Sequence, residues 1–285
     1  MTPLTTDTAL CTTAWLAENL SHPQVKIVDC SFFLPAMQRD AKAEFAQSRI
    51  AGSVFFDIDA VSDHNHPAPH MLPSPTVFAA EMNRLGIGAD SLVLAYDRLG
   101  LMSAARLWWS LRVFGHDSVW VLDGGFPKWL AENHPCEGGA VKDQLPPPMP
   151  FVARYRPELV KSMAEMVENI ETNQFQVFDA RSRGRFNGTE AEPRPGLASG
   201  HIPSSHSLPF TELLAGDKTV LPPAQIRHIF EDNGYQPGRE AVVSCGSGVT
   251  ACVLALGLYQ IGVRKVAVYD GSWGEWGASN NQINR

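Results

Sequence analysis

The sequence predicts an α/β fold in which two similar halves each form a parallel sheet flanked by helices. Two observations support this prediction: short apolar runs alternate with helical patterns, and one series of motifs occurs twice. Alternating strands and helices are typical of parallel sheets covered on both faces. At 285 residues, 44% of them hydrophobic and 19% charged, the chain is long enough for two globular domains.

The first half shows helical and strand patterns in alternation. Residues 13–20 have the pattern of a helix, and Val25–Asp29 follows as a β-rich run that ends in aspartate. The later elements expected in this half are a helix from Pro75, a strand over 91–97, a helix over 102–114 and a strand over 121–123. The tryptophans of these helices are expected to lie in the core rather than at a ligand.

The second half repeats this series. Asp29, Ile50, Asp97 and Asp123 correspond in order to Asp179, Ile202, Cys245 and Asp270, which lie 150, 152, 148 and 147 residues later. Its helices are expected at 163–170, 223–232 and 250–260. Four motifs in one order at nearly one offset indicate two homologous domains in tandem. One turn differs, because residues 50–52 are Ile-Ala-Gly whereas residues 202–204 are Ile-Pro-Ser.

The boundary between the halves is marked by composition. Residues 133–157 contain six prolines and two glycines, which is typical of a stiff, extended connection. We therefore predict an N-terminal domain over 1–135, a proline-rich linker over 136–157 and a C-terminal domain over 158–285.

Composition also excludes several partners. The net charge is −7 without a basic cluster, so neither nucleic acid nor an anionic membrane surface is an expected partner. No apolar run approaches the roughly 20 residues that span a bilayer. Residues 1–7 lack the pattern of a signal peptide, and we expect a cytoplasmic protein.

The five cysteines fit a reducing compartment. Their number is odd and no CxxC pair occurs, so neither a disulfide framework nor a zinc site is expected. Cys11, Cys30 and Cys252 are expected to be small buried hydrophobic residues, and Cys136 to lie exposed in a polar loop.

Cys245 stands apart from the other cysteines. It ends the apolar run from Ala241, glycines follow at 246 and 248, and a helical pattern begins at Thr250. Glycines allow successive amides to form an anion-binding nest, and a helix N-terminus adds partial positive charge. A cysteine in such a loop is stabilised as a thiolate, the nucleophilic form. The corresponding position of the first half is Asp97, so we expect the first domain to be non-catalytic.

With these motifs, the chain resembles the tandem-rhodanese sulfurtransferases over nearly its whole length. Residues 245–250, Cys-Gly-Ser-Gly-Val-Thr, are similar to the loop of the 3-mercaptopyruvate-specific members. The resemblance implies two rhodanese-like domains and transfer of sulfur from 3-mercaptopyruvate, through a Cys245 persulfide, to a thiol, thioredoxin or cyanide, with release of pyruvate. It implies neither a metal nor an organic cofactor.

The resemblance also implies roles for individual residues. Arg185 and Arg194 would bind the carboxylate and keto group of the substrate, a role that suits the planar guanidinium. Arg181 and Arg183 are left open. Ser247, His70 and Asp59 would form a proton-transfer triad, although His64, His66 and Asp57 are close enough in sequence to be confused with its members. The remaining loop residues, Gly246, Gly248, Val249 and Thr250, would surround the substrate sulfur.

Two other functions remain open. A thiosulfate sulfurtransferase would share the fold, but members of that type usually carry basic residues directly after the cysteine, where this chain has Gly246 and Ser247. A non-catalytic rhodanese-like binding protein is the other alternative, and the retained cysteine loop speaks against it. Phosphatase chemistry would require an arginine at position 251, which is Ala251.

Overall fold

The computed structural model describes residues 8–140 and 144–285. These residues form two compact units, the first comprising 8–61, 73–140, 144–155 and 216–219, and the second comprising 62–72, 156–215 and 220–285. The expectation for residues 1–7 lies outside the described residues, as do 141–143 of the expected linker. The predicted domain ranges stay a prediction. The units of the structure differ from them in two short segments, because residues 62–72 belong to the second unit and residues 216–219 to the first.

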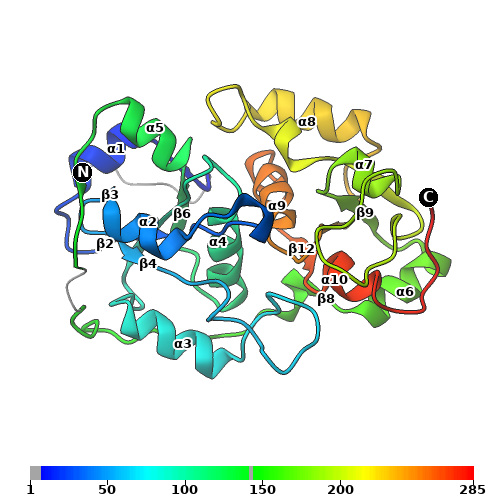
Figure 1. Ribbon diagram of the computed structural model, residues 1–285, viewed down its shortest axis with the longest axis horizontal. Helices are drawn as coiled ribbons and strands as arrows, with labels where there is room; N and C mark the ends of the chain where they lie inside the picture. Colours follow the sequence, from blue (N-terminus) through cyan, green and yellow to red (C-terminus); the bar gives the residue numbers. More distant parts are fainter. Residues whose placement is uncertain (1–7, 141–143) are drawn as a thin grey trace. The chain divides into compact units, whose positions relative to one another are not determined.

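A parallel sheet forms the centre of the first unit. Its strands are, in spatial order, β1 (Leu10–Cys11), β6 (Val119–Leu122), β5 (Leu92–Tyr96), β2 (Val25–Asp29) and β4 (Val54–Phe55). Every neighbouring pair is parallel, and Figure 1 shows these strands side by side in the first unit. Their carboxyl ends therefore meet at one edge of the sheet, where β2 ends at Asp29 and Asp97 follows β5.

Helices cover both faces of this sheet. On one face, α1 (Thr13–Asn19) and α5 (Gly125–Ala131) place Leu16 and Trp129 against Tyr96 of β5. On the other face, α4 (Ala104–Val113) packs on the sheet beside α3 (Pro75–Arg84), and Phe78 stacks on Phe114 at 4.4 Å. The shorter elements of this unit are α2 (Ala41–Gln47), a 3-10 turn at Pro35–Met37, and the antiparallel pair β3 (Arg49–Ile50) and β7 (Cys136–Glu137).

The second unit repeats the arrangement of the first. Its strands are, in spatial order, β10 (Ser205–Ser207), β9 (Gln176–Asp179), β11 (Ala241–Ser244), β12 (Val266–Tyr269) and β8 (Val160–Lys161), all parallel to their neighbours. α6 (Met163–Thr172) and α10 (Ser272–Trp276) cover one face, and α9 (Ala251–Gln260) with α8 (Pro223–Asp232) covers the other. The remaining elements are α7 (Arg183–Phe186) and 3-10 turns at Pro157–Leu159 and Phe210–Leu213.

The two units confirm the predicted α/β fold and its internal repeat. Strand β2 has the expected bounds, and the other predicted strands are found within one to two residues of their expected ends. Local signals explain several helix starts: Ser74 and Ser162 cap α3 and α6 through their side chains. The tryptophans Trp108, Trp109, Trp129, Trp273 and Trp276 are all at most 1% exposed, as expected of core residues. Trp15 of α1 differs, because it is only partly buried against the core of the first unit.

Residues 144–155 of the proline-rich segment pack along the first unit. Ala89 donates its amide to the Met149 carbonyl at 2.9 Å, and the Phe114 carbonyl accepts from Arg154 at 2.8 Å. Phe151 is buried at 4% exposure and contacts Phe78 edge-on. The segment therefore contributes an aromatic side chain to this unit, which its composition had not predicted. Across residues 8–140 and 144–285, no helix has the length and apolar character needed to cross a membrane.

Candidate functional site

The cysteine loop joins a buried strand to a buried helix in the second unit. Strand β11 ends at Ser244, Cys245 follows, and α9 begins at Ala251. Cys245 is 2% exposed, and Gly248 adopts a left-handed conformation with φ +72°. That backbone conformation favours glycine because a Cβ atom would strain it. The structure therefore places the thiol at the carboxyl edge of the parallel sheet, where α/β proteins bind ligands.

The start of α10 holds this loop through its backbone and one hydroxyl. Ser272 Oγ accepts from the amides of Cys245 and Gly248, both at 3.1 Å, and donates to the Tyr269 carbonyl at 2.8 Å. The Cys245 and Gly246 carbonyls accept from the amides of Trp273, at 2.9 Å, and Gly274, at 2.8 Å. The sequence motifs had not predicted a role for Ser272. The signal was the serine that stands where the repeat has Gly125.

Arg185 lies directly against the loop. A Cβ atom added to Gly246 would be 2.9 Å from the Arg185 guanidinium, so glycine at 246 leaves room for this cation. Glu192 holds the guanidinium from the other side, with Nη2 at 2.5 Å and Nε at 3.2 Å from one carboxylate oxygen. Glu192 itself is almost completely buried. The pair fixes a positive group beside the cysteine loop while partly balancing its charge.

A second buried arginine anchors Glu192. Arg181 donates to Glu192 at 2.7 Å and to Asp179 at 2.7 Å, and its guanidinium stacks on the Trp273 ring at 4.2 Å. Facing carboxylates raise the pKa of Arg181 although burial opposes this effect. Arg181, which the sequence left open, is therefore a buried structural cation that connects the Arg185–Glu192 pair to α10.

The two other arginines of this region differ from Arg181. Arg183 is exposed and pairs with Glu212 at 2.9 Å on the surface. Arg194 lies half-buried in the loop that follows Glu192, and its role in substrate binding stays a prediction.

His70 and Ser247 meet in the second unit although 177 residues separate them. His70 Nδ1 lies 3.0 Å from Ser247 Oγ, and both residues are buried, at 4% and 6% exposure. Asp270 Oδ2 accepts from the Leu72 amide at 2.7 Å and so fixes the segment that carries His70. His70 itself has φ +61°, an uncommon conformation for a residue with a side chain and one that clusters at functional sites.

The nearby histidine His66 points to a different partner. Its Nε2 lies 3.4 Å from Glu275, whereas the hydroxyl of the loop contacts His70. Among the histidines that the sequence could not rank, the structure thus brings His70 to the cysteine loop.

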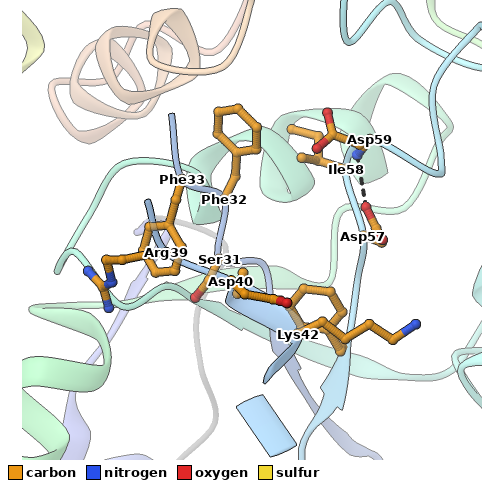
Figure 2. A pocket seen from close by; sticks show the side chains of 11 residues that line it. Ser31, Phe32, Phe33, Arg39, Asp40, Lys42, Asp57, Ile58 and Asp59 are labelled. Atoms are coloured by element: carbon orange, nitrogen blue, oxygen red, sulfur yellow. Dashed lines mark hydrogen bonds between the residues drawn. The ribbon is translucent and has the colours of Figure 1, made fainter. Parts of the chain in front are cut away.

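Asp59, the third expected member of the triad, belongs to the first unit. It lines a pocket of about 340 Å³ together with Arg39, Lys42 and Asp57 (Figure 2). The Asp57 carboxylate accepts from the Asp59 amide at 3.1 Å, the bond drawn as a dashed line in Figure 2, and also from Ala60. Asp57 therefore stabilises the local turn. The part of Asp59 in a triad stays a prediction.

In the corresponding loop of the first unit, the side chain of a loop residue binds the loop amides. Asp97 stands at the position of Cys245, and its carboxylate accepts from the amides of Leu99, Met102, Ser103 and Ala104 at 2.7–2.9 Å. These four amides donate to the Asp97 carboxylate, so they are not available to bind a ligand. No cluster of three or more histidine, cysteine or acidic side chains suited to a metal ion occurs within 8–140 and 144–285.

Comparison with known proteins agrees with this fold. The rhodanese-like domain family matches residues 12–132 and again 162–279. The two matches together cover most of the chain, so this chain belongs to the rhodanese-like domain family and contains two copies of its domain.

Individual relatives match over more than nine-tenths of both chains. The 3-mercaptopyruvate sulfurtransferase of Rattus norvegicus is 44% identical, over 94% of this chain and 91% of the relative. The thiosulfate sulfurtransferase of Cricetulus griseus is 40% identical, over 94% and 91%. The crystal structure of SseA from Escherichia coli, described as a 3-mercaptopyruvate sulfotransferase, aligns with TM-score 0.85 and 38% identity over 93% of this chain and 99% of that chain.

Proposed function

We propose that this chain is a 3-mercaptopyruvate sulfurtransferase that carries the transferred sulfur as a persulfide on Cys245. The observation that supports this donor is the hydrogen bond of 3.0 Å between Ser247 and His70. Loss of sulfur from 3-mercaptopyruvate leaves an enolate carbon that must be protonated, whereas thiosulfate would leave as sulfite without such a step. A buried hydroxyl–imidazole pair at the cysteine loop is suited to deliver that proton.

The first half-reaction is a displacement at sulfur. The Cys245 thiolate forms a bond to the sulfur of 3-mercaptopyruvate, and the carbon–sulfur bond breaks with its electron pair moving into the pyruvate enolate. The enolate carbon then takes a proton through Ser247 and His70, while the part of Asp59 in this triad rests on the family resemblance alone. The products are pyruvate and a Cys245 persulfide.

Arg185 and Arg194 would bind the carboxylate and keto oxygens of the donor. Arg185 is the better supported of the two, because its guanidinium lies against Gly246 at the loop. A single carboxylate matches a cation that Glu192 already balances in part. The amides of Gly246, Gly248, Val249 and Thr250 belong to the loop that would surround the sulfur.

The second half-reaction returns the enzyme to its thiol form. The outer sulfur of the persulfide is attacked by a thiol, by reduced thioredoxin or by cyanide, and the Cys245 thiolate leaves. The five cysteines all lie within the described residues and none of them is joined in a disulfide. We propose the reducing cytoplasm as the compartment.

The test is steady-state sulfur transfer to cyanide with 3-mercaptopyruvate and with thiosulfate. We expect kcat/KM to favour 3-mercaptopyruvate by at least about 100-fold, equivalent to ~2.7 kcal/mol. A preference for thiosulfate would contradict the proposed donor while leaving the Cys245 persulfide intact.

Two arginine variants sharpen this test. Arg185→Gln should raise KM for 3-mercaptopyruvate about 10-fold to 100-fold by removing a charge-assisted carboxylate contact. Arg183→Gln is the matched control, because Arg183 lies two residues away in the same helix and pairs on the surface. Equal KM values for the two variants would remove Arg185 from the binding site.

Thiosulfate sulfurtransferase remains the second candidate. The observation that favours it is the Arg185 cation beside the loop, since an arginine also binds the anionic donor thiosulfate. The donor comparison described above separates the two activities directly.

A further inference from the structure

We infer that Ser272 is a positioning residue that sets the direction of the amides in the cysteine loop. This inference deepens the proposed function and rests on it for the sulfur chemistry. Ser272 is completely buried and adopts a left-handed conformation with φ +49°. Such a conformation is costly for a residue with a side chain, so the site retains a serine where its backbone would favour glycine.

The hydroxyl of Ser272 makes three hydrogen bonds, all to backbone atoms. It accepts from the first and fourth amides of the loop, Cys245 and Gly248, and donates to the Tyr269 carbonyl. One oxygen atom therefore joins both sides of the loop to the end of β12. Its loss would leave two buried amides without this acceptor, and the loop could then relax.

The residues after Ser272 orient the next two peptides. The Cys245 and Gly246 carbonyls point to the amides of Trp273 and Gly274. The N–H of a trans peptide points opposite to its C=O, and the described chain contains no cis peptide. The amides of Gly246 and Ser247 must therefore point away from α10. Together with the N-terminus of α9, they form the donor set that remains for a negative charge on sulfur.

The first unit supports this assignment through the repeat. Its counterpart of Ser272 is Gly125, with φ +56°, and Phe126 donates to the Asp97 carbonyl at 3.0 Å as Trp273 does to Cys245. A Cβ atom at Gly125 would lie 2.6 Å from the Asp97 and Gly100 carbonyl oxygens. The backbone conformation is thus shared, whereas the hydroxyl occurs only beside the loop that carries the nucleophile.

The repeat also supplies the test variant. Ser272→Gly removes the hydroxyl and keeps a residue that accepts the left-handed conformation, as Gly125 does. We expect kcat for sulfur transfer to fall about 100-fold through misorientation of the loop, while KM for 3-mercaptopyruvate changes less than about twofold because carboxylate binding is untouched. A persulfide assay by mass spectrometry should show the loss in the first half-reaction.

The matched control is Ser244→Ala. Ser244 precedes Cys245 and is equally buried, but its hydroxyl has no hydrogen-bond partner among the described residues. This variant should retain the kcat of the original chain. Equal losses of kcat in the two serine variants would overturn the inference, because they would indicate a general sensitivity of this region to buried substitutions.

A second readout does not depend on the proposed donor. Alkylation of Cys245 by iodoacetamide, followed by peptide mapping, can be compared in the same sample with the exposed Cys136. Ser272→Gly should lower the Cys245-to-Cys136 rate ratio about tenfold, and Ser244→Ala should not. If the original chain transfers sulfur from no donor, the proposed function fails, yet this ratio still decides the role of Ser272.

Folding is checked by circular dichroism and thermal unfolding, with Ser272→Ala as the second variant. An unchanged rate ratio in a folded Ser272 variant would overturn the inference. Failure of both variants to fold, while Ser244→Ala folds, would also overturn it, because the hydroxyl would then act in folding and not in orienting the loop.

Discussion

The two units place different side chains, Asp97 and Cys245, at the same point of the same fold. In the first unit, four amides of the loop after β5 bind the carboxylate of Asp97. In the second unit, the loop after β11 carries Cys245, and the Ser272 hydroxyl accepts hydrogen bonds from two amides of this loop. The difference is that one copy of a duplicated domain fills the loop with its own carboxylate, whereas the other leaves two of its amides to Ser272 and carries the cysteine that we propose as the nucleophile.

The largest expected effect is a loss of sulfur-transfer activity from a substitution in the loop of the second unit. Cys245→Ser should lower kcat for sulfur transfer at least about 10⁴-fold, because the hydroxyl cannot form the persulfide. The unfolding midpoint should be nearly unchanged. Cys136→Ser, in the exposed β7 strand, is the control and should keep full activity. Appreciable transfer by the Cys245 variant would refute the assignment of the nucleophile.

The matching change in the first loop should affect stability rather than activity. Asp97→Asn replaces a buried carboxylate that accepts four amides, and we expect a loss of about 3 kcal/mol in urea unfolding. Sulfur transfer should persist at temperatures where the variant is folded. Asp217→Asn, an exposed carboxylate that accepts from Thr219, should leave the urea midpoint unchanged. Equal midpoints for both variants would show that the first loop does not depend on its internal anion.

Both units should lose stability in mild acid through one histidine each, the buried His116 and the half-buried His206. Burial lowers the pKa of His116 in the first unit and of His206 in the second, where Arg239 adds to the effect. The unfolded chain then binds a proton more readily than the folded one, so stability is fully present above pH of about 6.5 and is lost as the pH falls through the lowered folded-state values.

Urea unfolding between pH 8 and pH 5 measures this effect. His116→Gln and His206→Gln should each flatten the pH dependence. His228→Gln is the control, because its side chain is 75% exposed, and it should leave the slope as it was. If none of the three variants alters the slope of unfolding free energy against pH, other groups must cause the loss of stability in acid.

The smallest expected effect concerns a turn that the two halves build differently. Gly52 and Ser204 occupy corresponding positions with φ +78° and +63°. Gly52→Ala should cost about 1 kcal/mol, although open space surrounds the position, because the strain lies in the backbone. Ser204→Gly should gain about 0.5 kcal/mol. Thermal unfolding measures both, and shifts of the same sign would mean that the two turns are not equivalent.

Local sequence was sufficient to predict the helices and strands and to single out the loop of Cys245, whose role as nucleophile stays a prediction. Hydrophobic patterning and the repeat predicted the strands around Asp29, Asp97 and Cys245 and the helices that follow them. These features depend on residues close in sequence, and their backbone preferences and hydrophobic pattern can be recognised without knowing the fold. The glycines after Cys245 likewise identified the loop before any distance was known.

The tertiary structure alone decided which distant side chains meet. It placed residues 62–72 with the second unit, brought His70 rather than His66 to Ser247, and paired Arg185 with the buried Glu192. It also separated Arg181 from Arg183, which look alike in sequence, into a buried cation and a surface one. Such contacts depend on how packed elements bring together residues far apart in the chain, and no local preference encodes them. By itself, the sequence determined a duplicated α/β fold with one cysteine loop, and the packing determined which groups surround that cysteine.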